Sequence, residues 1–468
     1  METPTGSETI AGTDTALTSP NTTSPTVCVR VVASPDVKAV GHTVAVTGRG
    51  VVLGRAGNGP EQSDQIRLTD GRMSRGHARL VRPAPDAPVV LEDLGSKNGT
   101  SVNRGRVERV DLSPGDVLRT GDSLFVICPP ILDISNIDGG ETGLVGVSAA
   151  MREARHRIHR IAAADMAVLV LGETGTGKEV VANALHRLSN REGPFVPLNA
   201  SAIPKDLFES EIFGAREGAY SGAKRSRKGY LMEAHRGTLF LDEIGEMPHA
   251  VQSKLLRTME TGEVTPLGAT RGTRVDIRFI SATNSDVDAD ACAGRFRLDL
   301  LFRLAQLRVE LPPLRARRED IPILWDHFSD VPFANLGETT LQEALLCHVW
   351  PGNVRELRNV ARGLTIEART GPVTLHHLPD AIRIPYLAAR TNQPSNDDAS
   401  TTNHEPQTTA ARGLLPPGGR PTRDDLIAAI RAEAGNLAAV ARGFNRQRPQ
   451  VYRWLKRYDI DVDEILHS

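Results

Sequence analysis

The sequence has few cysteines and no long hydrophobic run. Its four cysteines, Cys28, Cys128, Cys292 and Cys347, are far apart and form no CxxC pair. This spacing indicates neither a zinc site nor a disulfide framework, so we expect buried free thiols. No apolar run approaches the roughly 18 residues that a membrane-spanning helix needs, and the N-terminus lacks the basic and apolar regions of a signal peptide. We therefore expect a cytoplasmic protein that does not engage a membrane.

The sequence also lacks an excess of charge of either sign. Its 56 basic and 57 acidic residues give a formal net charge of −1, which excludes a globally basic nucleic-acid binder but not a local basic patch. A content of 40% hydrophobic and 24% charged residues is typical of soluble globular proteins. At roughly 150 residues per domain, the 468 residues predict about three domains.

Composition changes along the chain mark the domains. Stretches rich in Thr, Ser and Pro predict a disordered tail and a linker. Short β-branched runs separated by turn residues predict an all-β sandwich. Apolar strands that alternate with helical stretches predict an α/β domain with a parallel sheet. A basic segment with helical periodicity at the end of the sequence predicts a small all-α domain. The expected segments are a tail at 1–25, a sandwich at 26–130, a linker at 131–143, an α/β domain at 144–384, a linker at 385–421 and an all-α domain at 422–468.

A phosphate-binding motif begins the α/β domain. The sequence GETGTGK follows an apolar strand, which matches the P-loop spacing in its strand–loop–helix context. The glycines let backbone N–H groups turn toward phosphates, and Lys178 reaches the β and γ phosphates of ATP. Glu179 stands where a Ser or Thr hydroxyl usually binds Mg²⁺. The expected ATP-binding residues are Gly172, Glu173, Thr174, Gly175, Thr176, Gly177, Lys178 and Glu179.

A second motif, GTLFLDEI, indicates hydrolysis and not only nucleotide binding. It is an apolar strand that ends in Asp242 and Glu243. Asp242 is positioned to hold Mg²⁺, directly or through water, and Glu243 to orient and deprotonate the attacking water. The two motifs together predict an ATPase.

Six segments in order carry a family resemblance. The segments GETGTGKE, PFVPLNASAIP, ESEIFGAREGAYSGA, GTLFLDEIGEMP, FRLDLLFRLAQLRVELPPLRARREDIPIL and WPGNVRELRNV resemble the AAA+ domain of bacterial sigma-54-dependent transcriptional activators. In that family Glu commonly follows the P-loop Lys, which accounts for Glu179. The resemblance implies a helical lid from about residue 313 and a ring of subunits, most often a hexamer.

The resemblance also implies roles for five further residues. Asn199 is similar to the polar switch that restrains Glu243, and Asn284 to the sensor I residue near the γ-phosphate. Arg297 and Arg303 resemble arginine fingers that enter the neighbouring subunit's site, and Arg355 resembles the sensor II arginine of the lid. A guanidinium supplies donors to oxygens whose charge changes in the transition state, which supports these roles; surface ion pairs are the alternative.

A loop between the two motifs resembles the GAFTGA loop that contacts sigma-54 in this family. Here the loop reads GAYSGA, so a Tyr replaces the Phe and a Ser replaces the Thr. Its glycines permit a tight, mobile turn, and a small-residue turn without a partner is the alternative. The expected sigma-54 contacts are Gly218, Ala219, Tyr220, Ser221, Gly222 and Ala223.

Turns in the predicted sandwich carry the segments LGR, SRGH and DLGSKNGT, followed by VN. Together these segments resemble the phosphate-binding loops of forkhead-associated (FHA) domains. Guanidinium, hydroxyl and amide donors hold a phosphate and the adjacent peptide backbone, and His77 is expected to be structural. The resemblance implies a phosphothreonine protein as ligand and a Ser/Thr kinase upstream; threonines of the tail, such as Thr13, are one candidate. The expected ligand contacts are Arg55, Ser74, Arg75, Lys97 and Asn98.

The end of the chain contains a run of six basic residues between Arg442 and Arg457 with no acid among them, which suits DNA phosphate contact and entry into the major groove. This helical segment resembles a Fis-type helix-turn-helix, which implies upstream promoter DNA as a partner. A solvated basic helix is the alternative. The expected DNA contacts are Gln447, Arg448, Gln450, Arg453 and Lys456.

These features together predict a multidomain transcription regulator. The expected function is ATP-dependent activation of sigma-54 RNA polymerase under phosphothreonine control. Two alternatives remain: a DNA-binding regulator that no longer engages sigma-54, and an AAA+ remodeller of another target.

Overall fold

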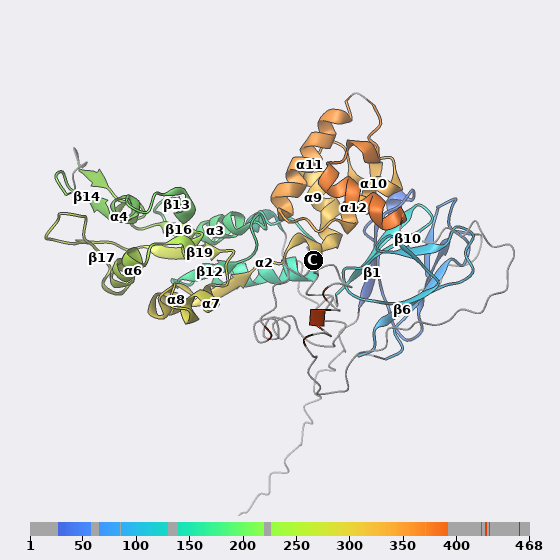
Figure 1. Ribbon diagram of the computed structural model, residues 1–468, viewed down its shortest axis with the longest axis horizontal. Helices are drawn as coiled ribbons and strands as arrows, with labels where there is room; N and C mark the ends of the chain where they lie inside the picture. Colours follow the sequence, from blue (N-terminus) through green and yellow to red (C-terminus); the bar gives the residue numbers. More distant parts are fainter. Residues whose placement is uncertain are drawn as a thin grey trace, which may run out of the picture. The chain divides into compact units, whose positions relative to one another are not determined.

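The computed structural model describes residues 27–57, 65–84, 86–129, 139–219, 226–369 and 371–391, together with Arg423, Leu426, Ile427, Ile430 and Tyr458 (Figure 1). The chain divides into two units, residues 1–394 and 395–468. The strands and helices below all belong to the first unit. Within the described residues, no helix has the length and apolar character that crossing a membrane would require.

The N-terminal domain is the expected β-sandwich. One sheet has the strand order β2-β1-β11-β10-β7-β8 and the other has the order β4-β3-β5-β6-β9. Buried side chains such as Leu53, Leu91 and Phe125 fill the space between the sheets. The strands are β1 (Cys28–Ala33), β2 (Thr43–Ala45), β3 (Val51–Arg55), β4 (Gln65–Leu68), β5 (Ala78–Val81), β6 (Val89–Asp93), β7 (Thr100–Val102), β8 (Gly105–Val107), β9 (Arg109–Leu112), β10 (Val117–Thr120) and β11 (Ser123–Cys128).

The cysteines correct one expectation. All four are free, and Cys28, Cys128 and Cys347 are buried, but Cys292 is exposed. Cys292 is the last residue of the short helix α7 (Val287–Cys292), of which only Val287 is buried, so its thiol has no core to enter. Cys28 and Cys128 are partners across the antiparallel β1–β11 pair, although they are 100 residues apart in sequence.

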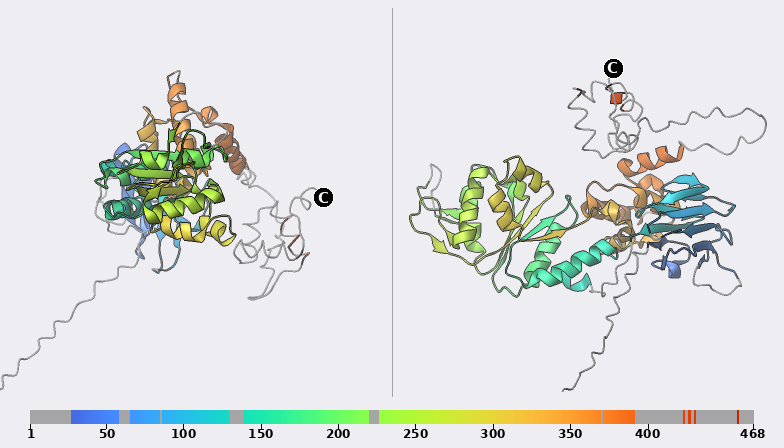
Figure 2. Two further views of the ribbon diagram at one scale, coloured as in Figure 1. Left: turned by 90° about the vertical axis from the view of Figure 1, so that its left-hand side faces the viewer. Right: turned by 90° about the horizontal axis from the view of Figure 1, so that it is seen from below.

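The α/β domain contains a parallel sheet with the strand order β13-β16-β19-β12-β20. Its three central strands are almost entirely buried, as expected for a sheet covered on both faces. Figure 2 shows helices on either side of this sheet. The strands are β12 (Val168–Leu171), β13 (Phe195–Asn199), β16 (Thr238–Asp242), β19 (Arg278–Thr283) and β20 (Leu307–Glu310); the main helices are α2 (Ala149–Ala162), α3 (Lys178–Arg187), α6 (His249–Thr261) and α8 (Leu298–Leu304).

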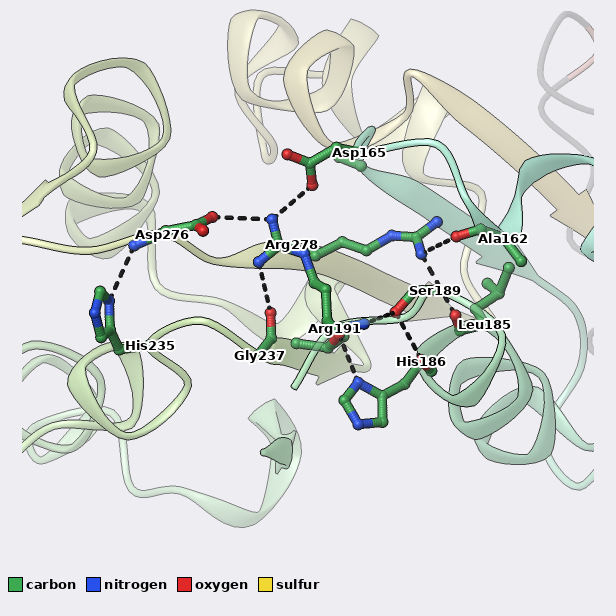
Figure 3. A network of polar contacts seen from close by, with 12 residues as sticks. Ala162, Asp165, Leu185, His186, Ser189, Arg191, His235, Gly237, Asp276 and Arg278 are labelled. Atoms are coloured by element: carbon green, nitrogen blue, oxygen red, sulfur yellow. Dashed lines mark hydrogen bonds and ion pairs between the residues drawn. The ribbon is translucent and has the colours of Figure 1, made fainter. Parts of the chain in front are cut away.

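A buried arginine ties two of these helices to the sheet. Arg278 of β19 is 2% exposed. Its guanidinium donates to the carbonyl oxygen of Ala162 at the end of α2 over 2.5 Å and to that of Leu185 in α3 over 3.4 Å (Figure 3). It also donates to the carbonyl oxygen of Ile161 in α2 over 3.1 Å. The last carbonyls of a helix lack intrahelical partners and carry partial negative charge, which a cation satisfies. Helix α3 begins at Lys178, so this contact fixes the far end of the helix that carries the P-loop lysine.

The lid follows as a helical bundle around buried Trp325, Trp350 and Tyr386. Two short 3-10 turns, Leu314–Ala316 and Arg318–Asp320, lead into it. Its apolar cluster continues onto the outer face of the β-sandwich, as described below. The lid helices are α9 (Ile321–Phe328), α10 (Thr339–Cys347), α11 (Asn353–Glu367) and α12 (Asp380–Thr391).

Candidate nucleotide and phosphopeptide sites

The P-loop lies between β12 and α3, at the carboxyl edge of the sheet. Gly175 has a φ of +80°, and a Cβ there would lie 2.3 Å from the carbonyl oxygen of Gly352 in the lid, so only glycine fits. Gly177 has a φ of +113° and caps α3. The loop therefore has the tight, left-handed backbone that its glycines predicted.

Lys178 and Glu243 face each other across this edge. The Lys178 ammonium is 3.8 Å from the Glu243 carboxylate and donates to the carbonyl oxygen of Gly172 over 2.9 Å. The backbone N–H of Asn284 lies 3.4 Å from the other Glu243 oxygen, and the Asn284 amide donates to the Thr174 hydroxyl over 2.8 Å. Three segments predicted separately thus meet at one place, with a cation and a carboxylate positioned for phosphate and water.

Asp242 and Asn199 end neighbouring strands beside this pair. They are direct partners in the parallel β13–β16 register. The Asn199 side-chain oxygen accepts from the N–H and hydroxyl of Ser201, over 2.9 and 2.7 Å. The adjacent carboxylates of Asp242 and Glu243 supply the oxygen donors that Mg²⁺ uses when it binds through one or two carboxylates and substrate phosphates.

The lid contacts the P-loop through Arg315, Arg317 and Asn353, to which the sequence analysis assigned no role. Glu173 pairs with Arg315 over 2.5 Å and accepts from the Asn353 amide over 3.2 Å. The Arg315 hydrogen bond, together with that from Asn353, outweighs partial burial and lowers the pKa of Glu173 to about 2. Arg317, which is 1% exposed, donates to the carbonyl oxygen of Thr176 over 3.1 Å. Arg315 and Arg317 lie in the family-like segment LPPLRARRED, but their partners lie far away in sequence, so spacing did not predict these contacts.

The hydrogen bonds described for the candidate arginine fingers join them to residues other than Glu243. Arg297 precedes α8 and pairs with Asp299 over 2.7 Å, and its guanidinium also reaches the Ser253 hydroxyl. The hydrogen bonds that Arg297 donates to the Asp299 carboxylate raise the pKa of Arg297. Arg303 is exposed and donates to the carbonyl oxygen of Met259 over 3.3 Å. Arg355 is exposed on α11, with its Cβ next to Gly175 of the P-loop.

The candidate phosphothreonine residues cluster on the sandwich loops. The Ser74 hydroxyl accepts from the backbone N–H of Lys97 over 3.1 Å, and the Asn98 amide donates to the Arg72 carbonyl oxygen. Arg55, Arg75, Lys97 and Asn98 are exposed. The loops carrying Ser74 and Asn98 therefore meet, and leave charged and amide donors open to a ligand.

Two buried groups hold these loops together. His77 is fully buried; its Nδ1 accepts from the Ser74 N–H, and its Nε2 is 3.1 Å from the Gly99 carbonyl oxygen. This agrees with the structural role expected for it. The Asp93 carboxylate accepts from Ser96 and Thr100, and although burial opposes ionisation, these hydrogen bonds lower its pKa.

Part of the expected site lies outside the described residues. In the GAYSGA loop only Gly218 and Ala219 are described; Tyr220, Ser221, Gly222 and Ala223 are not. The tail at 1–25 also lies outside the described residues. So do all of the DNA-binding candidates, which are Gln447, Arg448, Gln450, Arg453 and Lys456.

Comparison with known families covers most of the first unit. The chain matches the FHA domain over residues 51–121, the sigma-54 interaction domain over residues 144–310 and the AAA+ ATPase lid domain over residues 315–395.

Individual relatives are transcriptional regulators. The DNA-binding transcriptional regulator NtrC of Escherichia coli (strain K12) is 44% identical over 272 residues, 57% of this chain and 58% of the relative. NtrC of Rhizobium meliloti (strain 1021) is 34% identical over 450 residues, 89% of this chain and 93% of the relative. Among solved structures, NtrX from Brucella abortus in complex with ATP is 33% identical, covers 68% of this chain and 69% of that one, and has a TM-score of 0.46. The chain spans 56–58% of the length of the first three curated relatives.

Proposed function

This chain belongs to the NtrC-like family of sigma-54-dependent transcriptional regulators, and we propose that it is an ATPase that activates sigma-54 RNA polymerase. The observation that carries the proposal is the meeting of Lys178, Glu243 and Asn284 at one edge of the sheet. Lys178 binds the phosphates, Glu243 takes a proton from the attacking water, and the Asn284 amide senses the γ-phosphate. Mg²⁺, held through Asp242, would neutralise phosphate charge.

Energy from hydrolysis has to reach the polymerase through a surface element. We assign this role to the GAYSGA loop, in which Tyr220 keeps an aromatic ring and Ser221 keeps a hydroxyl. We further propose that a hexameric ring completes each site by inserting Arg297 and Arg303 from the neighbouring subunit. The exposure of Arg303 fits a contact made between subunits.

The test is promoter opening by sigma-54 RNA polymerase in a purified system. With ATP, the full chain should convert closed complexes to open ones on a promoter that carries its upstream DNA site. A non-hydrolysable ATP analogue, or the Glu243→Gln variant, should leave the promoter closed. Equal opening with the analogue would contradict the proposal, because activation would then not need hydrolysis.

The FHA domain supplies the regulatory input in this proposal. Ser74 and Asn98 bind the phosphate and the peptide backbone, and Arg55, Arg75 and Lys97 add charge. A degenerate phosphothreonine peptide library, with an unphosphorylated threonine library as control, would select the ligand. The Ser74→Ala variant should lose the preference for the phosphorylated library; if it keeps that preference, this site assignment fails.

The C-terminal residues place the ATPase at its promoter in this proposal. Arg448, Arg453 and Lys456 contact DNA phosphates, and Gln447 and Gln450 contact base edges. Because all of these partners act in the cytoplasm, we propose that location as well. Binding to promoter fragments should weaken steeply with salt for the wild type and less steeply for the Lys456→Ala variant.

A further inference from the structure

A cavity of about 260 Å³ lies where the FHA loops meet the lid. Asn98 and Gly99 of the phosphopeptide loop line one side of it. Among the lining residues that the structure describes, one is an acid and it comes from the lid helix α10. The charged lining residues are Arg72, Arg104, Arg106, Arg119 and Glu343.

Glu343 is held firmly in this position. It is 3% exposed, and its Oε2 accepts from Arg119 over 3.1 Å and from the Tyr386 hydroxyl over 2.8 Å. Tyr386 belongs to the lid and Arg119 to the FHA domain, so the carboxylate joins the two domains. A cavity lined by four guanidinium groups thus already contains one carboxylate, which is the kind of group such a cavity binds.

The contact around this carboxylate is an extended apolar seam. All six residues of β11 are buried, although alternate residues of a sandwich strand face outward. The inward side chains of β11, Phe125 and Ile127, belong to the sandwich core. The outward side chains belong instead to the apolar cluster of the lid, which includes Leu345 and Trp350. These outward residues are Leu124, Val126 and Cys128. The lid therefore covers the outer face of the FHA sheet.

The same contact reaches the nucleotide site through one short segment. Arg318 donates to the carbonyl oxygen of Gly115 in the FHA domain over 2.8 Å. Its neighbours Arg315 and Arg317 hold Glu173 and Thr176 of the P-loop. Movement of the FHA domain relative to the lid would thus pull on Arg318. Arg318 is one position from Arg317 and three from Arg315, the two residues that hold the P-loop.

We propose that Glu343 is an internal competitor for the FHA ligand. An acidic side chain of the bound phosphopeptide, next to its phosphothreonine, enters the arginine-lined cavity and takes Arg119 from Glu343. The like charge then repels Glu343, and the FHA domain loosens from the lid of its own subunit. The proposal rests on phosphothreonine recognition by the FHA domain and adds how that binding reaches the P-loop.

The test measures phosphopeptide affinity in full-length variants. Glu343→Gln keeps the shape of the side chain and its contact with Tyr386 but removes the competing charge. It should tighten binding of the library-selected phosphothreonine peptide by about fivefold or more, the lower end of coupling between sites. Glu367→Gln makes the same charge change at an exposed lid position and should leave the affinity within about twofold of wild type. A Glu343→Gln variant that binds like wild type, or more weakly, overturns the proposal.

A second measurement tests the release of the lid. The ATP turnover of Glu343→Gln without peptide should shift in the same direction as peptide shifts the wild type, since both weaken one contact. An opposite shift, or none, overturns this step even if affinity changes. Wild type and Glu343→Gln could also bind phosphorylated and unphosphorylated peptide equally well, with Ser74→Ala leaving the affinity unchanged. Phosphothreonine recognition by the FHA domain would then be wrong, and the competition by Glu343 with it.

Discussion

At the residue scale, Glu243 carries the proposed chemistry, and its replacement separates hydrolysis from binding. Glu243→Gln keeps the hydrogen-bonding shape but cannot take a proton, so kcat for ATP should fall by about 10²–10⁴-fold. The dissociation constant for ATP should change little, because Lys178 and the P-loop remain. Glu246→Gln, an exposed neighbour, is the matched control. Undiminished turnover in Glu243→Gln would assign the base to another residue.

Glu319 gives a prediction on pH at the same scale. It is 3% exposed, and burial, reinforced by Asp320, raises its pKa to about 7 from 4.5. The folded state therefore binds the Glu319 proton more tightly than the unfolded state does. The stabilisation of the folded state by this proton is complete below pH 4.5 and is lost as the pH rises through 7.

The Glu319→Gln variant removes this titration. At pH 8 it should be more stable than wild type by on the order of 3 kcal/mol, and the difference should shrink toward pH 4.5. Thermal unfolding of both chains across this pH range measures it. A pH-independent difference between the two chains would exclude Glu319 as the titrating group.

At the element scale, Arg278 joins α2 and α3 to the sheet by three bonds to backbone carbonyls. Arg278→Met fills a similar volume but leaves these carbonyls without donors. Unfolding in urea should show a loss of about 2–4 kcal/mol. Arg274→Met, on an exposed strand, is the control and should stay near wild type. Equal stability of the two variants would mean that other groups satisfy the helix ends.

The strands and motifs at this scale could be predicted from sequence because their signals are local. Apolar runs such as MAVLVLG became β12, and the residues after β12 and β16 met at Lys178 and Glu243 because parallel strands end at one edge. The lid contacts of Arg315 and Glu343 could not be predicted. Arg315 and Glu173 are 142 positions apart, and Arg119 and Glu343 are 224 apart, so no spacing rule links them.

At the scale of the whole molecule, the arginine fingers predict that active sites form between subunits. Arg303→Ala and Glu243→Gln should each be inactive alone. Mixed assemblies should regain activity, because a Glu243→Gln subunit still supplies Arg303 to the intact catalytic residues of its neighbour. ATP turnover measured across mixing ratios tests this, with wild type mixed with Glu243→Gln as the reference. Mixtures that stay inactive at every ratio would argue against a finger acting from the neighbouring subunit.

The central claim, that ATP chemistry drives engagement of sigma-54, has one direct measurement. Full-length protein is incubated with sigma-54, with or without ADP and a metal fluoride that mimics the transferring phosphate, and complexes are separated on a native gel. We predict a complex with the mimic, none with ADP alone, and loss of the complex in Tyr220→Ala. If protein that hydrolyses ATP forms no complex with the mimic, the claim is contradicted, and a regulator without sigma-54 contact or a remodeller of another target takes its place.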